Sequence, residues 1–231
     1  MVKISRLQKK IQETVDRQKR YSLKDAIDVL KNAPKPKFDE SVDVAMMLGV
    51  DPKKITQPIR GTVALPHGTG KKVRVVCVCK GEDEKKAVDA GADEAGSAEL
   101  IKKIQGGWCD FDVAVATPDM MKDMARLGKV LGPKGLMPNP KSGTVTTDVG
   151  KTIKEIKAGK IEYKMDKQSG IHVAVGKLSF DAEKLYENAR DFISSVISAN
   201  PALSKPQGIK SIAVAKSMGP GLKLDLNEFR K

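Results

Sequence analysis

The sequence predicts a split α+β domain built around an antiparallel sheet, interrupted by an inserted α/β domain. Residues 42–48 and 209–226, towards the two ends of the chain, alternate apolar with smaller or polar side chains, as strands with one buried face do. Residues 73–79 form a nearly continuous apolar run instead. This run alternates with helical patterns, which is typical of a parallel sheet covered on both faces.

Two helices and a strand are expected before the insert. Ser22 and Asp25 resemble a capping box, in which a serine side chain accepts from a free backbone N–H, and Pro34 closes the helix that follows. Residues 42–48 then predict the first strand. An earlier helix is predicted by apolar residues three or four apart: Ile4, Leu7, Ile11 and Val15.

The insert is expected to alternate short apolar strands with helices. Residues 131–140 combine three prolines with two glycines and predict a rigid loop, and Gly159 ends the last helix. The predicted strands are residues 73–79 and 112–116, and the predicted helices are residues 82–90, 97–104, 118–131 and 148–158.

The antiparallel pattern returns after the insert. Residues 161–165 and 171–175 alternate on either side of a turn at residues 166–170 and predict a hairpin. A long helix is expected from Asp181, and Pro201 stops it.

The last predicted hairpin, residues 209–226, has an unusual turn in which Gly219 and Gly221 flank a proline. Bare backbone at a sheet edge lets another backbone approach closely. A plain connection is the simpler interpretation of an isolated Gly-Pro-Gly. The functional interpretation therefore depends on other segments.

Charge favours a polyanionic partner, because 42 Lys and Arg stand against 29 Asp and Glu, a net charge of +13. We expect residues 1–66 and 160–231 to form the split domain and residues 67–159 the insert. On this division the split domain carries +10 and the insert +3, which places phosphate binding mainly on the split domain. Since only 4% of residues are aromatic, shape and backbone contacts should dominate over base stacking.

The three cysteines indicate a reducing compartment, because the number is odd and Cys77 and Cys79 lie in an apolar run. A zinc site would need about four ligands at regular spacings, whereas Cys109, His67 and His172 are scattered, so core cysteines are favoured. No apolar run approaches the roughly 20 residues that span a bilayer, and the N-terminus is polar rather than signal-like. We expect a cytoplasmic protein without metal, cofactor or membrane contact.

Two glycine-containing loops resemble ligand-binding loops but lack the context. Residues 68–71, Gly-Thr-Gly-Lys, have too short a glycine spacing for a phosphate loop and precede a strand, so a hinge or connector is favoured. No paired carboxylates, Ser/His pair or Cys/His pair accompanies residues 131–140. A rigid loop or contact surface is therefore favoured there over a small-molecule site.

Two polar segments of the split domain each have two interpretations. Phe38 is either a core residue or a contact to a sugar or base, with Ser41 donating to a phosphate. Asp166 and Lys167, with His172 beyond them, form either a solvated hairpin tip or a site that accepts from a ribose 2′-hydroxyl.

Six motifs occur together, in order, over essentially the whole chain. They are Lys-Phe-Asp-Glu-Ser at residues 37–41, Arg-Gly-Thr-Val-Ala-Leu-Pro-His-Gly-Thr-Gly-Lys at 60–71, Leu-Gly-Pro-Lys-Gly-Leu-Met-Pro-Asn-Pro-Lys at 131–141, Asp-Lys-Gln-Ser-Gly-Ile-His at 166–172, Ala-Val-Gly-Lys at 174–177 and Ser-Met-Gly-Pro at 217–220. With them the chain resembles the bacterial L1 family of ribosomal proteins, which form the stalk of the large subunit. The resemblance implies a split domain that carries a Rossmann-like, three-layer insert.

The resemblance also implies partners. The chain is expected to bind a folded segment of 23S ribosomal RNA near the exit site of the large subunit and to assist release of deacylated exit-site tRNA. It is further expected to repress its own operon mRNA through a similar RNA shape, and to be a monomer when free. The implied RNA-binding residues are Lys37, Phe38, Ser41, Lys164, Asp166, Lys167, His172, Ser211, Ser217, Met218 and Gly219.

The favoured function is thus a non-enzymatic RNA-binding protein. Met218 is expected to rest on a base or sugar, and Gly219 to be the point of closest backbone approach, so that Gly219→Val should abolish tight binding and leave the fold intact. Two alternatives remain. One is a cytosolic α/β enzyme that binds a phosphorylated ligand in the insert, and the other is non-specific DNA binding, which leaves the uncharged turns unexplained.

Overall fold

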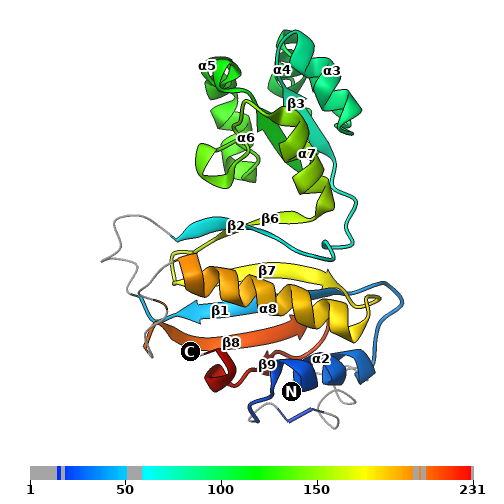
Figure 1. Cartoon of the computed structure of the whole chain (residues 1–231), viewed down its shortest axis with the longest axis vertical. Helices are drawn as coiled ribbons and strands as arrows, with labels where there is room; N and C mark the ends of the chain where they lie inside the picture. Colours follow the sequence, from blue (N-terminus) through cyan, green and yellow to red (C-terminus); the bar gives the residue numbers. More distant parts are fainter. Residues whose placement is uncertain (1–14, 17–18, 51–58, 200–202, 204–206, 230–231) are drawn as a thin grey trace, which may run out of the picture. The chain divides into compact units, whose positions relative to one another are not determined.

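The structure is a computed structural model that describes residues 15–16, 19–50, 59–199, 203 and 207–229. The chain forms two compact units (Figure 1). Unit 1 comprises Met1–Lys71 and Tyr163–Lys231, and unit 2 comprises Lys72–Glu162. The helix predicted from Ile4 to Val15 falls, except for Val15, outside the described residues.

Unit 1 is built around a four-stranded antiparallel sheet in the order β7-β1-β8-β9. Its helices α2 and α8 pack against each other and against β8 and β7 respectively, so they cover one face of the sheet (Figure 1). The strands are β1 (Ser41–Leu48), β7 (Gly170–Lys177), β8 (Ile209–Lys216) and β9 (Leu222–Lys223), and the helices are α2 (Leu23–Asn32) and α8 (Ala182–Ala199).

The predicted alternation of β1 is confirmed, because its even-numbered residues, from Val42 to Leu48, are buried. The predicted start of α2 is also confirmed, since Ser22 Oγ accepts a hydrogen bond from the Asp25 amide at 3.1 Å. Strand β9 is shorter than expected. Leu226 lies not in a strand but in η4 (Leu226–Phe229), a 3-10 turn.

The hairpin predicted from residues 161–165 and 171–175 is wrong. Strand β6 (Lys160–Lys164) pairs with β2 (Arg60–Ala64), a strand that the sequence did not predict, whereas β7 pairs with β1. Alternation specifies which face of a strand is buried but does not specify its partner. The Tyr163 ring of β6 packs edge-on against Phe192 of α8, with ring centroids 5.9 Å apart.

Unit 2 contains a three-stranded parallel sheet in the order β4-β3-β5, as the apolar runs predict. One face packs on Leu100, Ile101 and Ile104 of α4, and the other packs on apolar residues of α3 and α7. The bounds are β3 (Val75–Val78), β4 (Glu94–Gly96), β5 (Val113–Ala116), α3 (Glu82–Asp89), α4 (Ala98–Gln105) and α7 (Val149–Ala158). The three-residue β4 was not predicted.

The single helix predicted over residues 118–131 is instead a series of short helical pieces, and the last of them runs into the predicted loop. These are η1 (Pro118–Met120), α5 (Met121–Met124), η2 (Ala125–Leu127) and α6 (Gly128–Lys134), and a further 3-10 turn, η3 (Pro140–Ser142), follows. Buried Met120, Met124, Leu127 and Leu131 keep one apolar face throughout. That face explains why the helical course continues through a segment rich in proline and glycine. Gly135, at a φ of +71°, ends α6.

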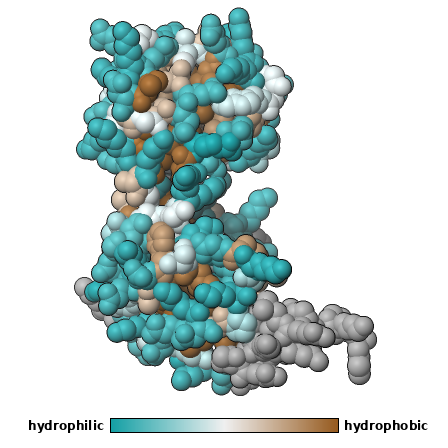
Figure 2. Space-filling view, turned by 90° about the vertical axis from the view of Figure 1, so that its right-hand side faces the viewer, coloured by the Kyte–Doolittle hydropathy of each residue, from teal (hydrophilic) through white to brown (hydrophobic). Residues whose placement is uncertain are grey.

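Cys77 and Cys79 are buried in unit 2, as predicted for core cysteines, and their sulfur atoms lie 3.5 Å apart. Burial raises the pKa of both thiols. Most of the described surface in Figure 2 is hydrophilic, with smaller apolar areas between. In the described part of the chain no helix combines the length and the apolar character needed to cross a membrane.

Candidate nucleic-acid interface

The face of the unit 1 sheet opposite α2 and α8, here called the outward face, is lined by small and polar side chains. Successive side chains of a strand point to opposite faces, so the residues between the buried ones lie on this face. They are Ser41, Asp43, Ala45 and Met47 of β1, His172 and Ala174 of β7, and Ser211, Ala213 and Ala215 of β8. Alanines at its centre let a partner come close to the backbone.

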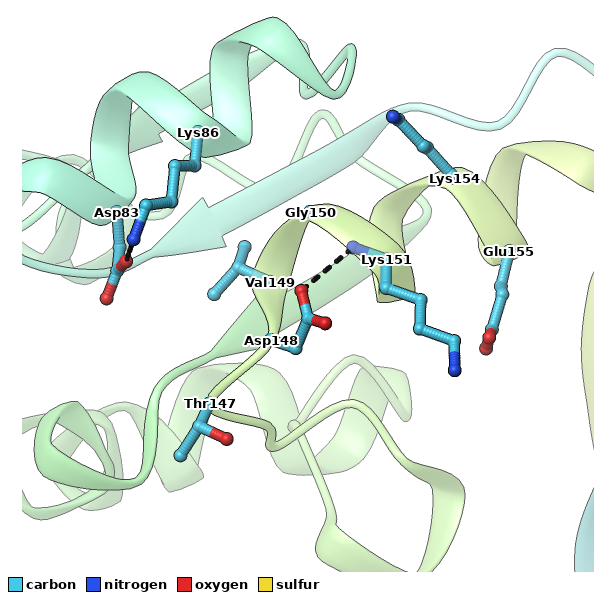
Figure 3. A pocket seen from close by; sticks show the side chains of 9 residues that line it. All are labelled: Asp83, Lys86, Thr147, Asp148, Val149, Gly150, Lys151, Lys154 and Glu155. Carbon is cyan, nitrogen blue, oxygen red and sulfur yellow. Dashed lines mark hydrogen bonds and ion pairs between the residues drawn. The ribbon is translucent and has the colours of Figure 1, made fainter.

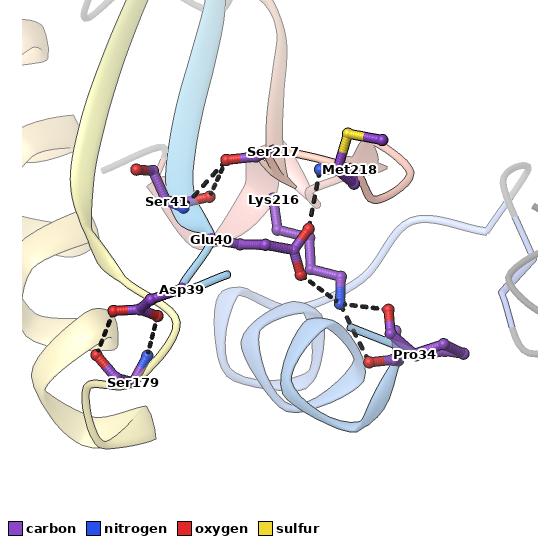
Figure 4. A network of polar contacts seen from close by, with 9 residues as sticks. Pro34, Asp39, Glu40, Ser41, Ser179, Lys216, Ser217 and Met218 are labelled. Carbon is purple, nitrogen blue, oxygen red and sulfur yellow. Dashed lines mark hydrogen bonds and ion pairs between the residues drawn. The ribbon is translucent and has the colours of Figure 1, made fainter. Parts of the chain in front are cut away.

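Five predicted site residues gather where β1 begins, with exposed Lys37 just before them. The Ser41 amide donates to Ser217 Oγ at 3.1 Å (Figure 4), and the Ser217 amide donates to the Ser41 carbonyl at 3.1 Å. These bonds fix the β8–β9 turn beside the strand start. We call this set the start group: Lys37, Phe38, Ser41, Ser217, Met218 and Gly219.

The start group exposes two large apolar side chains. Phe38 is 54% exposed and Met218 is 55% exposed, which excludes the interpretation of Phe38 as a core residue. Exposed apolar groups cost free energy in water unless a partner covers them. Lys177 Nζ donates to Ser41 Oγ at 2.9 Å, which brings a cation to the same place.

Four other predicted residues lie further along the sheet, from the middle of β1 to its far end. In the register, His172 is paired with Ala45 of β1, and Ser211 is paired with Met47. The turn that holds Asp166 and Lys167 leads into β7. We call Asp166, Lys167, His172 and Ser211 the end group.

The predicted residues therefore do not converge on one point. Ser41 and Met47 are six residues apart along β1, which corresponds to about 20 Å at a strand's rise of about 3.3 Å per residue. The two groups border the same outward face. A partner that touches both must follow the length of the sheet.

Asp166 organises its own turn. Its Oδ1 accepts hydrogen bonds from the Gly170 amide at 2.6 Å and the Gln168 amide at 2.8 Å. These bonds, the Gly170 bond first, hold the pKa of Asp166 below its ordinary value, and the nearby His172 acts in the same direction. Asp166 Oδ2 lies 3.9 Å from His172 Nε2. The carboxylate thus has a structural role that the sequence did not reveal.

Gly219 has a role within unit 1 that the sequence did not reveal. A Cβ atom at this position would lie 2.3 Å from Lys216 Cγ, so the glycine makes room for a side chain of its own unit. A valine at this position has to displace the Lys216 side chain, so Gly219→Val is expected to disturb packing within unit 1 as well as RNA binding. At Gly221, by contrast, a Cβ atom would meet nothing within 4 Å.

Lys164 is the last residue of β6, two residues before Asp166 of the end group, and does not belong to the four-stranded sheet. Lys37, Lys164 and Lys167 are exposed. Unit 1 as a whole has 26 Lys and Arg against 15 Asp and Glu, a net charge of +11, and unit 2 has 16 against 14, or +2. The positive potential that attracts phosphates thus belongs mainly to unit 1.

Sequence reasoning missed three residues of this region. Met47 is an exposed apolar residue at an outward position of β1, where its neighbours are small. Glu40 and Lys216 are fully buried, and Lys216 Nζ lies 3.1 Å from Glu40 Oε2 (Figure 4). The sequence does indicate this burial. Glu40 is two residues before the buried Val42, and Lys216 is two residues after the buried Val214, so both side chains point to the buried face of the sheet. Opposite charges at inward positions of two strands indicate a buried ion pair.

Unit 2 has a surface pocket at the start of α7 (Figure 3). Lys86 Nζ lies 3.0 Å from Asp83 Oδ1, and Asp148 Oδ1 accepts from the Lys151 amide at 3.2 Å. The lining is Asp83, Lys86, Thr147, Asp148, Val149, Gly150, Lys151, Lys154 and Glu155, in which three lysines face three carboxylates. Balanced charge gives an anionic ligand no net attraction. Over the described residues, no group of His, Cys, Asp and Glu could hold a metal ion.

Comparison with known proteins places the chain in one family. Residues 29–220 match the ribosomal protein L1p/L10e family. The chain is 52% identical over 220 residues to the large ribosomal subunit protein uL1 of Protochlamydia amoebophila, covering 95% of this chain and 93% of that protein. It is also 52% identical over 219 residues to uL1 of Chlamydia trachomatis serovar L2, covering 95% and 94%. The chain belongs to the ribosomal protein L1p/L10e family.

Proposed function

We propose that this chain binds a folded segment of 23S ribosomal RNA through the outward face of unit 1, with the start group and the end group as its two contact regions. The observation that carries the proposal is the pair of exposed apolar side chains, Phe38 and Met218. Both stand more than half exposed at a hydrogen-bonded strand end, in a unit with a net charge of +11. Apolar side chains beside cations suit the stacked and charged surface of RNA.

Affinity and specificity have different sources in this proposal. Lysines and arginines of unit 1 supply salt-dependent affinity for phosphates. Specificity comes from shape and from contacts to 2′-hydroxyl groups, which Ser41, Ser211 and His172 are able to make from the outward face. The separation of about 20 Å between the two groups favours a folded RNA segment over a single extended loop, because both groups must be met at once.

Family membership gives the chain its setting. As a ribosomal protein of this family it is a structural, non-enzymatic constituent of the large ribosomal subunit and is located on the ribosome. We further propose that it lies at the stalk near the exit site, where it assists release of deacylated tRNA. A similar RNA shape in its own operon mRNA would compete for the same outward face and repress translation of that operon.

Hydrogen exchange with and without a ribosomal RNA stem-loop tests the proposal on the full chain. We expect slower exchange at residues 38–47, 166–172 and 211–219, which include both contact groups. The stem-loop is a segment of 23S ribosomal RNA, and a scrambled RNA of equal length is the control. Slower exchange confined to the pocket at the start of α7 would contradict the proposal and favour a phosphorylated ligand in unit 2.

A further inference from the structure

A fully buried ion pair lies directly beneath the start group. The side chains of Lys216, the last residue of β8, and Glu40, which precedes β1, are 0% exposed, and Lys216 Nζ lies 3.1 Å from Glu40 Oε2. Lys216 Nζ also donates to the carbonyls of Ala33 at 3.1 Å and Pro34 at 2.9 Å, where α2 ends (Figure 4). The pair thus joins α2, β1 and β8 at one point.

The pair reaches the exposed turn through a backbone amide. Glu40 Oε1 accepts a hydrogen bond from the Met218 amide at 2.9 Å (Figure 4). On the other side, the Lys216 stem fills the space that a side chain at Gly219 would need. Glu40 therefore holds the Met218 amide, and Lys216 packs against the next residue, Gly219. The Met218 side chain itself projects into solvent.

Stability alone does not explain such a pair. Taking two charges out of water costs more than most buried pairs regain, and apolar residues of similar volume often serve the fold equally well or better. A charged pair with directed hydrogen bonds, in contrast, selects one geometry for the segments that it joins. The segments joined here are those that present Phe38 and Met218.

We infer that Glu40 and Lys216 are positioning residues for RNA recognition: they hold the Met218 turn in its binding geometry at the start of β1 and do not themselves touch RNA. This inference rests on the proposed function of unit 1. A preorganised turn loses less conformational entropy on binding than a mobile one, so the pair raises affinity without adding a contact.

The test compares the full-length protein with Glu40→Met/Lys216→Met. This double variant replaces the pair by apolar side chains of similar length and removes the acceptor of the Met218 amide. We expect a folded protein, by circular dichroism and thermal unfolding, whose affinity for the ribosomal RNA stem-loop falls at least about tenfold, the scale on which an interface responds to loss of an anchor. Unchanged affinity would overturn the inference.

The salt dependence of binding separates positioning from direct contact. A lysine that binds a phosphate contributes about 0.7–0.9 to the slope of log affinity against log salt concentration. We expect the double variant to keep the wild-type slope, whereas the matched control Lys37→Met, which removes an exposed lysine of the start group, lowers it. An equal loss of slope in the double variant would make Lys216 a direct contact and overturn the inference.

Two further measurements test the inference even if Glu40→Met/Lys216→Met does not fold. Glu40→Gln/Lys216→Met keeps an acceptor for the Met218 amide and should bind within about threefold of the wild type, with the same slope. In the wild-type protein free of RNA, the Met218 amide should exchange slowly with solvent, and fast exchange would overturn the inference. If the wild type itself fails to distinguish the stem-loop from scrambled RNA, the proposed function fails, whatever the variants show.

Discussion

The side chain of Lys216 occupies the space that any side chain at Gly219 would need, since a Cβ atom there would lie 2.3 Å from Lys216 Cγ. Because Lys216 is fully buried and bonded at its end, it has little freedom to move away. Packing within unit 1 thus favours glycine at position 219.

Gly219→Val should destabilise the protein by about 1–3 kcal/mol, the cost of overpacking a filled site. The matched control is Gly221→Ala two residues further along, where a Cβ atom meets nothing within 4 Å, and its effect should stay within about 0.5 kcal/mol. Chemical denaturation of both variants measures the difference. Equal stability of the two variants would contradict the role given to Lys216.

Phe38→Ala should weaken binding of the ribosomal RNA stem-loop about tenfold to a hundredfold, since an aromatic side chain stacked on a base contributes about 1–3 kcal/mol. Met218→Ala should weaken it about tenfold, the scale on which an interface responds to loss of an apolar anchor. Both side chains are more than half exposed, so the free energy of unfolding should hardly change. Val88→Ala is the control, because Val88 is an apolar residue of unit 2 with 58% exposure. Filter binding and thermal unfolding give the two readouts. Loss of affinity in the Val88 variant as well would argue against a localised interface.

Asp166 should make the turn before β7 sensitive to acid. Hydrogen bonds from the Gly170 and Gln168 amides lower its pKa below the ordinary 3.8, so its carboxylate stabilises the fold above that pH. The stabilisation should disappear as the pH falls from 3.8 through the lowered value. The measurement is the stability difference between the wild type and Asp166→Ala at pH 7 and at successively lower pH. If the stability difference between the two proteins grew as the pH fell, it would contradict a stabilising role for the Asp166 carboxylate.

The thiols of Cys77 and Cys79 should resist alkylation in the folded protein, because burial raises the pKa of both and excludes the reagent. Cys109 is only partly buried and should react. Mass spectrometry after brief treatment with iodoacetamide is expected to find one modified cysteine, and three after denaturation. Rapid native labelling of Cys77 would show that the core of unit 2 opens readily.

Elements with a strong period could be predicted from the sequence. Strand β1 and helices α2 and α8 follow their apolar patterns, and the parallel sheet of unit 2 follows its continuous apolar runs. Pairing could not be predicted in the same way, because the alternation in β6 fits any partner and β2 buries little beyond Val63. The pieces from η1 to α6 keep a helical apolar face, so the sequence pattern does not mark the breaks between them.

The sequence indicates candidate residues for the site but not their layout. Family motifs indicate Phe38, Ser217 and His172, yet only the strand register shows that the first two lie at the start of β1 and the third beside Ala45, further along the strand. The ion pair beneath the start group could be predicted from the alternation along β1 and β8, because Glu40 and Lys216 both occupy positions that point to the buried face. Neither composition nor motif matching reveals a charged residue on the buried face of a strand; only its position in the alternating pattern does.

Binding of the full-length protein to a ribosomal RNA stem-loop and to a scrambled RNA of equal length, across a series of salt concentrations, tests the central claim most directly. The account predicts that affinity for both RNAs falls steeply with salt, and that the stem-loop stays favoured at every concentration because shape contacts remain when phosphate contacts weaken. Equal binding of the two RNAs at all salt concentrations would contradict it, since charge alone would then account for the affinity.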